Sequence, residues 1–103
     1  LLSKNMQIHL FRTIQEAMSN IIKHAEATAA KVIVQSMKKE VIITILDNGK
    51  GFDHELAIVT SKSLGLRTML ERISVVNGQL KIGRNMPTGT IVEIKIPKKK
   101  QAR

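Results

Sequence analysis

Apolar side chains recur with a helical period between about residues 5 and 25, a stretch without glycine or proline. A step of 100° per residue gathers them on one arc about 140° wide. This apolar arc contains Leu10, Phe11, Ile14, Ala17, Met18, Ile21, Ile22 and Ala25. The opposite arc contains Arg12, Thr13, Gln15, Glu16, Ser19, Asn20 and Lys23, with His24 at its border. We therefore expect an amphipathic helix that buries the apolar arc in the core and leaves the polar arc outside.

Two short apolar runs follow this helix and predict a β-hairpin. Residues 31–37 and 41–46 are rich in valine and isoleucine and are joined by a tight turn. Because the second run is almost continuously apolar, we expect its strand to be buried on both faces or nearly so. Residues 52–64 then lack a sustained period, which predicts a loop with one helical turn at residues 55–58.

A second helix is predicted for residues 66–76, where apolar side chains again keep a helical spacing. Its inward side contains Leu66, Met69, Leu70 and Ile73. The helix should end at Asn77 and Gly78, because glycine readily takes the left-handed conformation that follows a helix.

Alternation of apolar and polar residues predicts two final strands, at residues 79–84 and 90–96, joined by a turn at residues 85–89. Thr90 lies on the core-facing side of the last strand, where its hydroxyl needs a polar partner such as a neighbouring carboxylate. The order helix, two strands, loop, helix, two strands predicts an α/β (α+β) two-layer sandwich. In this fold, helices cover one face of a mixed, mostly antiparallel sheet.

The composition is that of a single globular domain of 103 residues, 43% of them hydrophobic. The net charge of +9 attracts polyphosphates, acidic proteins and nucleic acids alike. Aromatic residues are only 2% of the chain, with no tryptophan or tyrosine, so unpaired bases have no platform on which to stack. We therefore expect no nucleic-acid binding, and divide the chain into a domain of residues 1–97 and a basic, solvated tail of residues 98–103.

The start of the chain and its cysteine content bear on where the protein works. The chain begins with leucine, which indicates a fragment of a longer protein, and it contains no cysteine, which fits a reducing compartment. No apolar run approaches the roughly 20 residues that cross a bilayer, and no signal-peptide pattern opens the chain. We expect a cytoplasmic domain without membrane contact. If the parent protein is anchored in a membrane, its anchor lies outside this piece.

Candidate chemistry begins where the apolar run 41–46 meets Asp47, followed by Gly49 and Gly51. The strand fixes the carboxylate at its edge, next to a low-dielectric core that strengthens any hydrogen bond it accepts. The two glycines remove side-chain bulk, so a flat or anionic ligand can lie against the backbone. This pattern favours a ligand site, although an ordinary strand-to-loop turn explains it equally well.

A second cluster lies on the polar arc of the first helix. Glu16, Asn20 and Lys23 are four and then three residues apart, so they stack in one row of a regular helix. The amide oxygen of Asn20 can ligate a hard cation such as Mg²⁺, and Lys23 with His24 can meet phosphate charge. This row favours a metal-polyphosphate site, while a solvated helix face is the alternative interpretation.

Four segments, in order along the chain, resemble the sequence boxes of the ATP-binding domain of sensor histidine kinases. They are residues 11–25, residues 47–53, residues 65–72 and Gly89–Thr90. The amino-acid sequences of the first and third segments resemble those of the branch of nitrate sensors and fatty-acid-desaturase sensors. The resemblance covers nearly the whole chain and implies the Bergerat fold, shared with gyrase and MutL, in agreement with the layered order above.

The resemblance also implies a role for each candidate residue. Asp47 would accept the adenine amino hydrogen, with Thr90 holding that carboxylate or a bridging water. Asn20 would ligate Mg²⁺ on the phosphates of ATP, and Glu16 would act beside it as the catalytic acid that orients or polarises the attacking group. Further nucleotide-binding residues would be Lys23, His24, Gly49, Gly51, Gly65 and Leu66. Residues 52–64 would form a lid over ATP, with Ser63 in place of a glycine that is often found there.

Kinases of this kind act with partners. The resemblance implies transfer of the γ-phosphate to a histidine on a separate dimerisation domain, with a response regulator downstream and a homodimeric parent protein. Two alternatives stay open, namely a conformational ATPase in which Glu16 activates water, and a nucleic-acid-binding module that uses the basic tail. Salt-dependent DNA binding that survives Asp47→Asn would favour the second of these.

Overall fold

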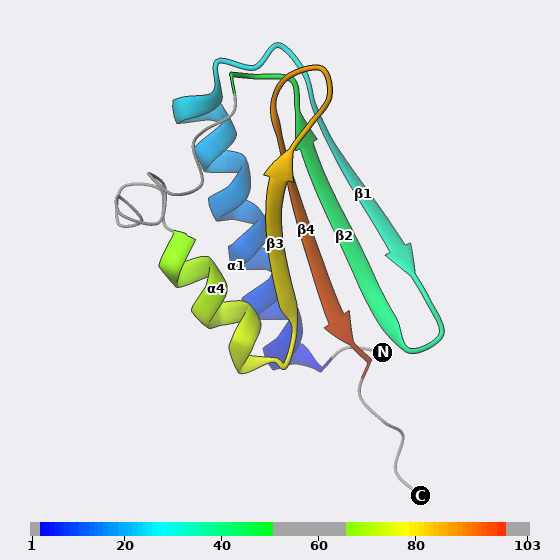
Figure 1. Cartoon of the computed structure of the whole chain (residues 1–103). Coiled ribbons are helices and arrows are strands. Elements are labelled where there is room, and N and C mark those ends of the chain that lie inside the picture. The colour runs from blue at the N-terminus through cyan, green and yellow to red at the C-terminus, as the bar shows by residue number, and fades with distance from the viewer. Residues whose placement is uncertain (1–2, 51–65, 99–103) are drawn as a thin grey trace, which may run out of the picture.

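Two helices lie on one face of a four-stranded sheet in the computed structural model, which describes residues 3–50 and 66–98 (Figure 1). The helices are α1 (Lys4–Asn20), which continues into the π-helical turn η1 (Ile21–Ala25), and α4 (Leu66–Val75). The strands are β1 (Ala30–Ser36), β2 (Glu40–Asp47), β3 (Gln79–Arg84) and β4 (Thr90–Pro97). Their order is β1-β2-β4-β3, and each neighbouring pair is antiparallel, so the described sheet is antiparallel throughout rather than mixed. The predicted two-layer sandwich is confirmed, and each predicted strand lies within one residue of its observed bounds.

Helix α1 is rotated relative to its predicted arcs. Leu10 is buried as predicted, but Phe11 and Ile22, expected in the core, are 61% and 79% exposed. Thr13, expected outside, is 0% exposed, and its hydroxyl donates to the carbonyl oxygen of His9 at 2.8 Å. Because this hydroxyl is satisfied within its own helix, the Thr13 methyl group can pack in the core at little polar cost.

Capping residues set the ends of both helices. The Ser3 hydroxyl accepts a hydrogen bond of 3.2 Å from a first-turn amide of α1. Among the described residues other than glycine, positive φ occurs at Glu26 after η1, at 53°, and at Asn77 after α4, at 60°. The residue predicted to take the left-handed conformation is Gly78, and that prediction is wrong. Glycine is needed there for close packing, because a Cβ atom would lie 2.8 Å from the carbonyl oxygen of Lys95.

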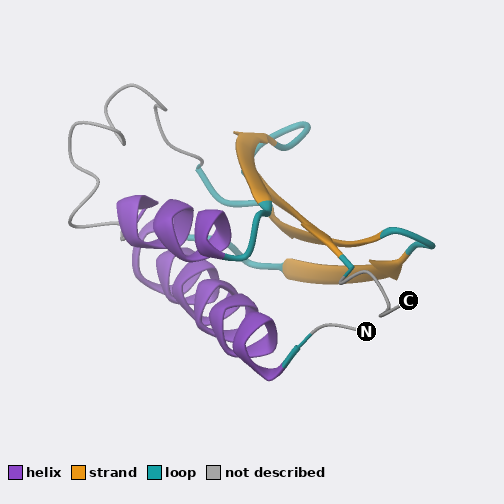
Figure 2. Cartoon of the chain, turned by 90° about the horizontal axis from the view of Figure 1, so that it is seen from below, coloured by secondary structure: helices purple, strands orange, loops and turns teal. Residues whose placement is uncertain are grey.

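In the part of the chain that the structure describes, the helices cover one face of the sheet and leave the other face uncovered (Figure 2). On β2, Ile43, Ile45 and Asp47 are buried, whereas the residues between them are half-buried. The prediction that this strand is buried on both faces or nearly so is therefore wrong for the second face, which is only half-buried because neither α1 nor α4 lies on it. Strand β1 is exposed along its whole length, since it forms the edge of the sheet farthest from the helices (Figure 1).

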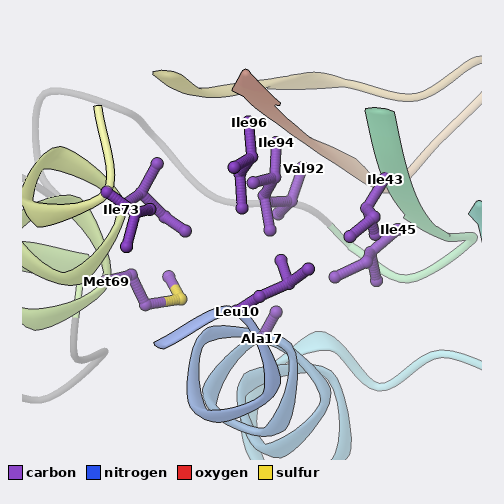
Figure 3. Packing of buried hydrophobic residues seen from close by; sticks show 10 residues of the cluster. Leu10, Ala17, Ile43, Ile45, Met69, Ile73, Val92, Ile94 and Ile96 are labelled. Atoms are coloured by element: carbon purple, nitrogen blue, oxygen red, sulfur yellow. The ribbon is translucent and has the colours of Figure 1, made fainter. Parts of the chain in front are cut away.

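Side chains from both layers meet in one core (Figure 3). Its buried members are Leu10, Ala17, Ile43, Ile45, Met69, Ile73, Val76, Val92, Ile94 and Ile96. Leu70, predicted to point inward, is 49% exposed, because Met69 and Ile73 already occupy the buried row of α4 and Leu70 is rotated by about 100° from Met69.

Several predicted features lie outside the described residues. They are Gly51, Gly65, the loop of residues 52–64 with its helical turn, and most of the basic tail. Within residues 3–50 and 66–98, the helices are too short or too polar to cross a bilayer.

Candidate functional site

Asp47, the last residue of β2, is 4% exposed. Its Oδ1 atom accepts a hydrogen bond of 2.8 Å from the backbone amide of Gly49. The register of β2 and β4 pairs Leu46 with Ile91, so the next position along β2 brings Asp47 level with Thr90. Thr90 is 6% exposed. The sheet thus brings together the carboxylate and the hydroxyl that were predicted at neighbouring strand ends.

The burial of Asp47 calls for compensation by a donor. Among the described residues the ion pairs are Lys50–Glu26, at 3.4 Å, and Lys95–Glu93, at 3.9 Å, and neither involves Asp47. A carboxylate removed from water is costly unless hydrogen bonds or an opposite charge compensate it. The amide of Gly49 satisfies one oxygen in part, and a carboxylate offers about four acceptor positions on its two oxygens. Asp47 can therefore accept further hydrogen bonds from a ligand.

Gly49 joins this strand end to the first helical segment. A Cβ atom on Gly49 would lie 2.1 Å from the carbonyl oxygen of Ala25, the last residue of η1. The amide of Lys50 donates to that same oxygen at 2.8 Å. The predicted role of Gly49 was to clear space for a ligand. The described contact is with backbone, and it fixes the loop after β2 against the end of the helix that carries Asn20.

Asn48 anchors the connection between η1 and β1. Its Oδ1 atom accepts hydrogen bonds from the amides of Thr28, at 2.9 Å, and Ala29, at 3.0 Å. Its Nδ2 atom donates to the Thr28 hydroxyl at 2.8 Å. These bonds span about 20 residues of sequence, and the spacing of motifs gave no sign of them. They fix the connection between η1 and β1 on one side of Asp47.

The turn between β3 and β4 holds the other side. The Nδ2 atom of Asn85 donates to the main-chain carbonyl oxygen of Asp47 at 2.9 Å. Gly89, with φ of 113°, lies so close that a Cβ atom would be 1.9 Å from that oxygen. The Thr88 hydroxyl donates to the carbonyl of Asn48 at 3.2 Å. From the sequence, residues 85–89 are predicted only as a turn that leads into the Gly89–Thr90 segment, because their contacts with Asp47 and Asn48 become visible only once β2 and β4 are known to be neighbours.

The helical segment carries the remaining candidates. Glu16 and Asn20, one turn apart on α1, are both half-buried. Lys23 is exposed and lies in η1, where His24 follows it. The predicted row assumed 3.6 residues per turn, and this holds for Glu16 and Asn20 on α1. The wider π-helical turn takes Lys23 out of that row.

Glu16 also lines a groove of 970 Å³ between α1 and α4. Ser19 of α1 and Arg72 of α4 are among the other lining residues. Asp47 and Asn20 do not line this groove, so it adjoins the candidate site and does not contain it.

The donor set around Asn20 bears on the predicted metal. Within residues 3–50 and 66–98, no three side chains of histidine, aspartate or glutamate gather in a way that could hold an ion. Mg²⁺, however, keeps several waters and usually binds through one or two protein oxygens together with substrate phosphates. The amide of Asn20, with the carboxylate of Glu16 one turn away, fits a Mg²⁺ ion shared with phosphates.

Comparison with known proteins decides the family. Residues 5–100 match the family described as histidine kinase-, DNA gyrase B-, and HSP90-like ATPase. The chain belongs to this family. It is 41% identical over 97 residues to the signal transduction histidine-protein kinase/phosphatase DegS of Bacillus subtilis (strain 168), covering 93% of this chain and 25% of DegS. It is 36% identical over 96 residues to the sensor histidine kinase LiaS of the same strain, covering 93% of this chain and 26% of LiaS.

The chain therefore spans about a quarter of the length of these curated relatives. Solved structures of other proteins have the same fold as this chain. The ATP binding domain of PrrB from Mycobacterium tuberculosis superposes with a TM-score of 0.78 at 23% identity, covering 90% of this chain and 69% of that one. The blue-light activated histidine kinase EL346 of Erythrobacter litoralis gives a TM-score of 0.79 at 22% identity, covering 93% and 31%.

Proposed function

We propose that this chain is the catalytic ATP-binding domain of a two-component sensor histidine kinase, and that it binds ATP with Mg²⁺. The observation that carries the proposal is the buried carboxylate of Asp47 at the end of β2. Its Oδ1 atom accepts from the Gly49 amide, and no described lysine or arginine forms an ion pair with it. A donor on a ligand would compensate this burial. The amino group of adenine is such a donor.

Each candidate residue has a role in this proposal. Asp47 reads the adenine amino group, and Thr90 holds the carboxylate or a bridging water. Asn20 ligates Mg²⁺ on the phosphates, and Glu16 orients or polarises the attacking group. The metal ion, when bound, neutralises charge on the phosphate oxygens. The remaining nucleotide-binding residues of the proposal are Lys23, His24, Gly49, Gly51, Gly65 and Leu66.

The proposed reaction needs partners beyond this chain. The γ-phosphate passes to a histidine on a dimerisation domain of the parent protein, which acts as a homodimer, and a response regulator works downstream. The similarity of residues 11–25 and 65–72 to nitrate and desaturase sensors supports a parent protein from that branch. The piece itself works in the cytoplasm, and any membrane anchor belongs to the parent protein.

Substitution of Asp47 tests the nucleotide assignment. Asp47→Asn keeps the size of the side chain but removes its charge, and we expect calorimetry to show a loss of about 100-fold in affinity for Mg-ATP. Glu93→Gln is the matched control, because it removes a carboxylate from β4 at a half-exposed position that pairs with Lys95. Circular dichroism should show a native fold for both variants. Normal affinity in a folded Asp47→Asn protein would remove the central assignment.

A second measurement separates the kinase from a conformational ATPase. The chain is incubated with γ-labelled ATP and the dimerisation domain of its parent protein, and we expect label on a histidine of that domain. Glu16→Ala should reduce this transfer. Hydrolysis of ATP by the chain alone, lost in Glu16→Ala, would instead favour the ATPase.

A further inference from the structure

Asn85 makes a contact that the proposed function does not use. It directly follows β3, and its Nδ2 atom reaches the main-chain carbonyl oxygen of Asp47 across 38 residues of sequence. Its Oδ1 atom accepts from the amide of Met86 at 3.0 Å. Because an amide carries its donor and its acceptor on opposite arms, the bond to Met86 requires the donor arm to face Asp47. The side chain is therefore held in one orientation.

The same carbonyl oxygen is enclosed from a second direction. The backbone of Gly89 lies where only a residue without Cβ fits against Asp47. The amide of Asn85 donates to the carbonyl of Gly89 at 3.0 Å, so the turn closes on itself and Asn85 moves with Gly89. The carbonyl of Asp47 thus lies in a slot made of one side-chain donor and one glycine. Fixing this peptide group fixes the direction in which the Asp47 side chain leaves the strand.

The carboxylate itself has one described restraint of its own, the bond of 2.8 Å from the Gly49 amide to Oδ1. A hydrogen bond weakens steeply when its angle falls below about 120°, so its strength depends on where the carboxylate is held. The backbone restraint from Asn85 and the side-chain restraint from Gly49 act on opposite ends of Asp47. Together they leave the carboxylate little freedom to follow a poorly matched base.

We propose that Asn85 is a positioning and specificity-determining residue, which aims the Asp47 carboxylate at the exocyclic amino group of the bound purine. This inference rests on the proposed function, because it assumes that Asp47 reads the base. Asn85 acts through Asp47 and does not touch the nucleotide. A base with a carbonyl group in place of that amino group faces the carboxylate with an acceptor, and the rigid carboxylate rejects it.

A purely structural role for Asn85 makes a different prediction. If the residue only closed the turn, its loss would lower the unfolding free energy and would weaken the binding of every nucleotide equally. If it aims the carboxylate, its loss weakens ATP binding more than the binding of inosine triphosphate, whose base carries a carbonyl where adenine carries the amino group. The ratio of the two dissociation constants is therefore the quantity to measure.

The test compares Asn85→Ala and Asn85→Asp with the wild-type chain, using calorimetry with Mg-ATP and Mg-inosine triphosphate. Asn85→Ala removes the donor, and the ATP preference should fall about fivefold. Asn85→Asp also places an acceptor against the carbonyl of Asp47, so the preference should fall further. Gln79→Glu, at the other end of β3, is the matched amide-to-acid control and should keep the wild-type ratio.

Each outcome supports or overturns the positioning role of Asn85. A fall in the ATP preference that is confined to the Asn85 variants supports the inference. An unchanged ratio in folded Asn85→Ala, or an equal fall in Gln79→Glu, overturns it while the proposed function stands. If Asn85→Asp does not fold, Asn85→Ala decides, because it adds no charge. A wild-type chain that binds both nucleotides equally overturns base reading by Asp47, while its binding of Mg-ATP would leave the rest of the proposed function standing.

Discussion

The backbone of Gly49 lies directly against the carbonyl group of Ala25, at a distance that leaves no room for a side chain. The amide of the next residue, Lys50, donates to the same oxygen at 2.8 Å. This contact joins the end of the helical segment that carries Glu16 and Asn20 to the loop that follows Asp47. This contact therefore fixes the position of the helical part of the proposed nucleotide site relative to the loop that follows Asp47.

Gly49→Ala should disrupt the contact between this loop and Ala25. The added methyl group would sit 2.1 Å from a backbone oxygen, which cannot move aside as a flexible side chain can. Overpacking of this kind costs about 1–3 kcal/mol, so we expect urea denaturation to show a loss of unfolding free energy in that range. Calorimetry should show weaker Mg-ATP binding as well.

Gly83→Ala on β3 is the control for this change, because a Cβ atom there would meet nothing within 4 Å. It should leave stability unchanged or raise it slightly, since alanine restricts the unfolded chain more than glycine does. A Gly49→Ala protein as stable as Gly83→Ala would show that the loop can move away from Ala25 without cost.

Thr90→Val tests the hydroxyl that lies level with Asp47. Valine keeps the shape of threonine and removes only the hydroxyl, so the 6% exposed site stays filled. Loss of one hydrogen bond to the carboxylate or its water should weaken Mg-ATP binding by about fivefold. The unfolding free energy should change by less than about 1 kcal/mol.

Thr44→Val provides the comparison, because Thr44 lies between buried Ile43 and Ile45 and so points to the other face of β2. It should bind Mg-ATP as the wild type does in the same calorimetric titration. Equal affinities for Thr90→Val and Thr44→Val would remove Thr90 from the proposed site.

Much of the fold was predictable because its signals are local. Alternating apolar residues placed β3 and β4 within one residue, and the same alternation predicted that Thr90 faces the core. Helical spacing placed α1 and α4, but it misjudged which residues are buried. Thr13 entered the core because its hydroxyl bonds to a carbonyl of its own helix, and a hydrophobicity pattern does not register that compensation.

The support of the candidate site was not predictable in the same way. The bonds of Asn48 to Thr28 and of Asn85 to Asp47 join segments 20 and 38 residues apart. Which segments meet depends on the sheet order β1-β2-β4-β3, and the sequence alone predicted the strands without that order. The motif residue Asp47 was therefore recognised, while the residues that hold it required the structure.

The one-sided cover of the sheet gives a final prediction about stability. Val92 on β4 is 8% exposed beneath the helices, whereas Val34 on edge strand β1 is 63% exposed. Val92→Ala removes two buried methyl groups and leaves a cavity, so urea denaturation should show a loss of about 2 kcal/mol. Val34→Ala is the same chemical change outside the core and should cost less than about 0.5 kcal/mol. Equal losses in the two variants would mean that another surface covers β1 in solution, because burial is what makes a methyl group costly to remove.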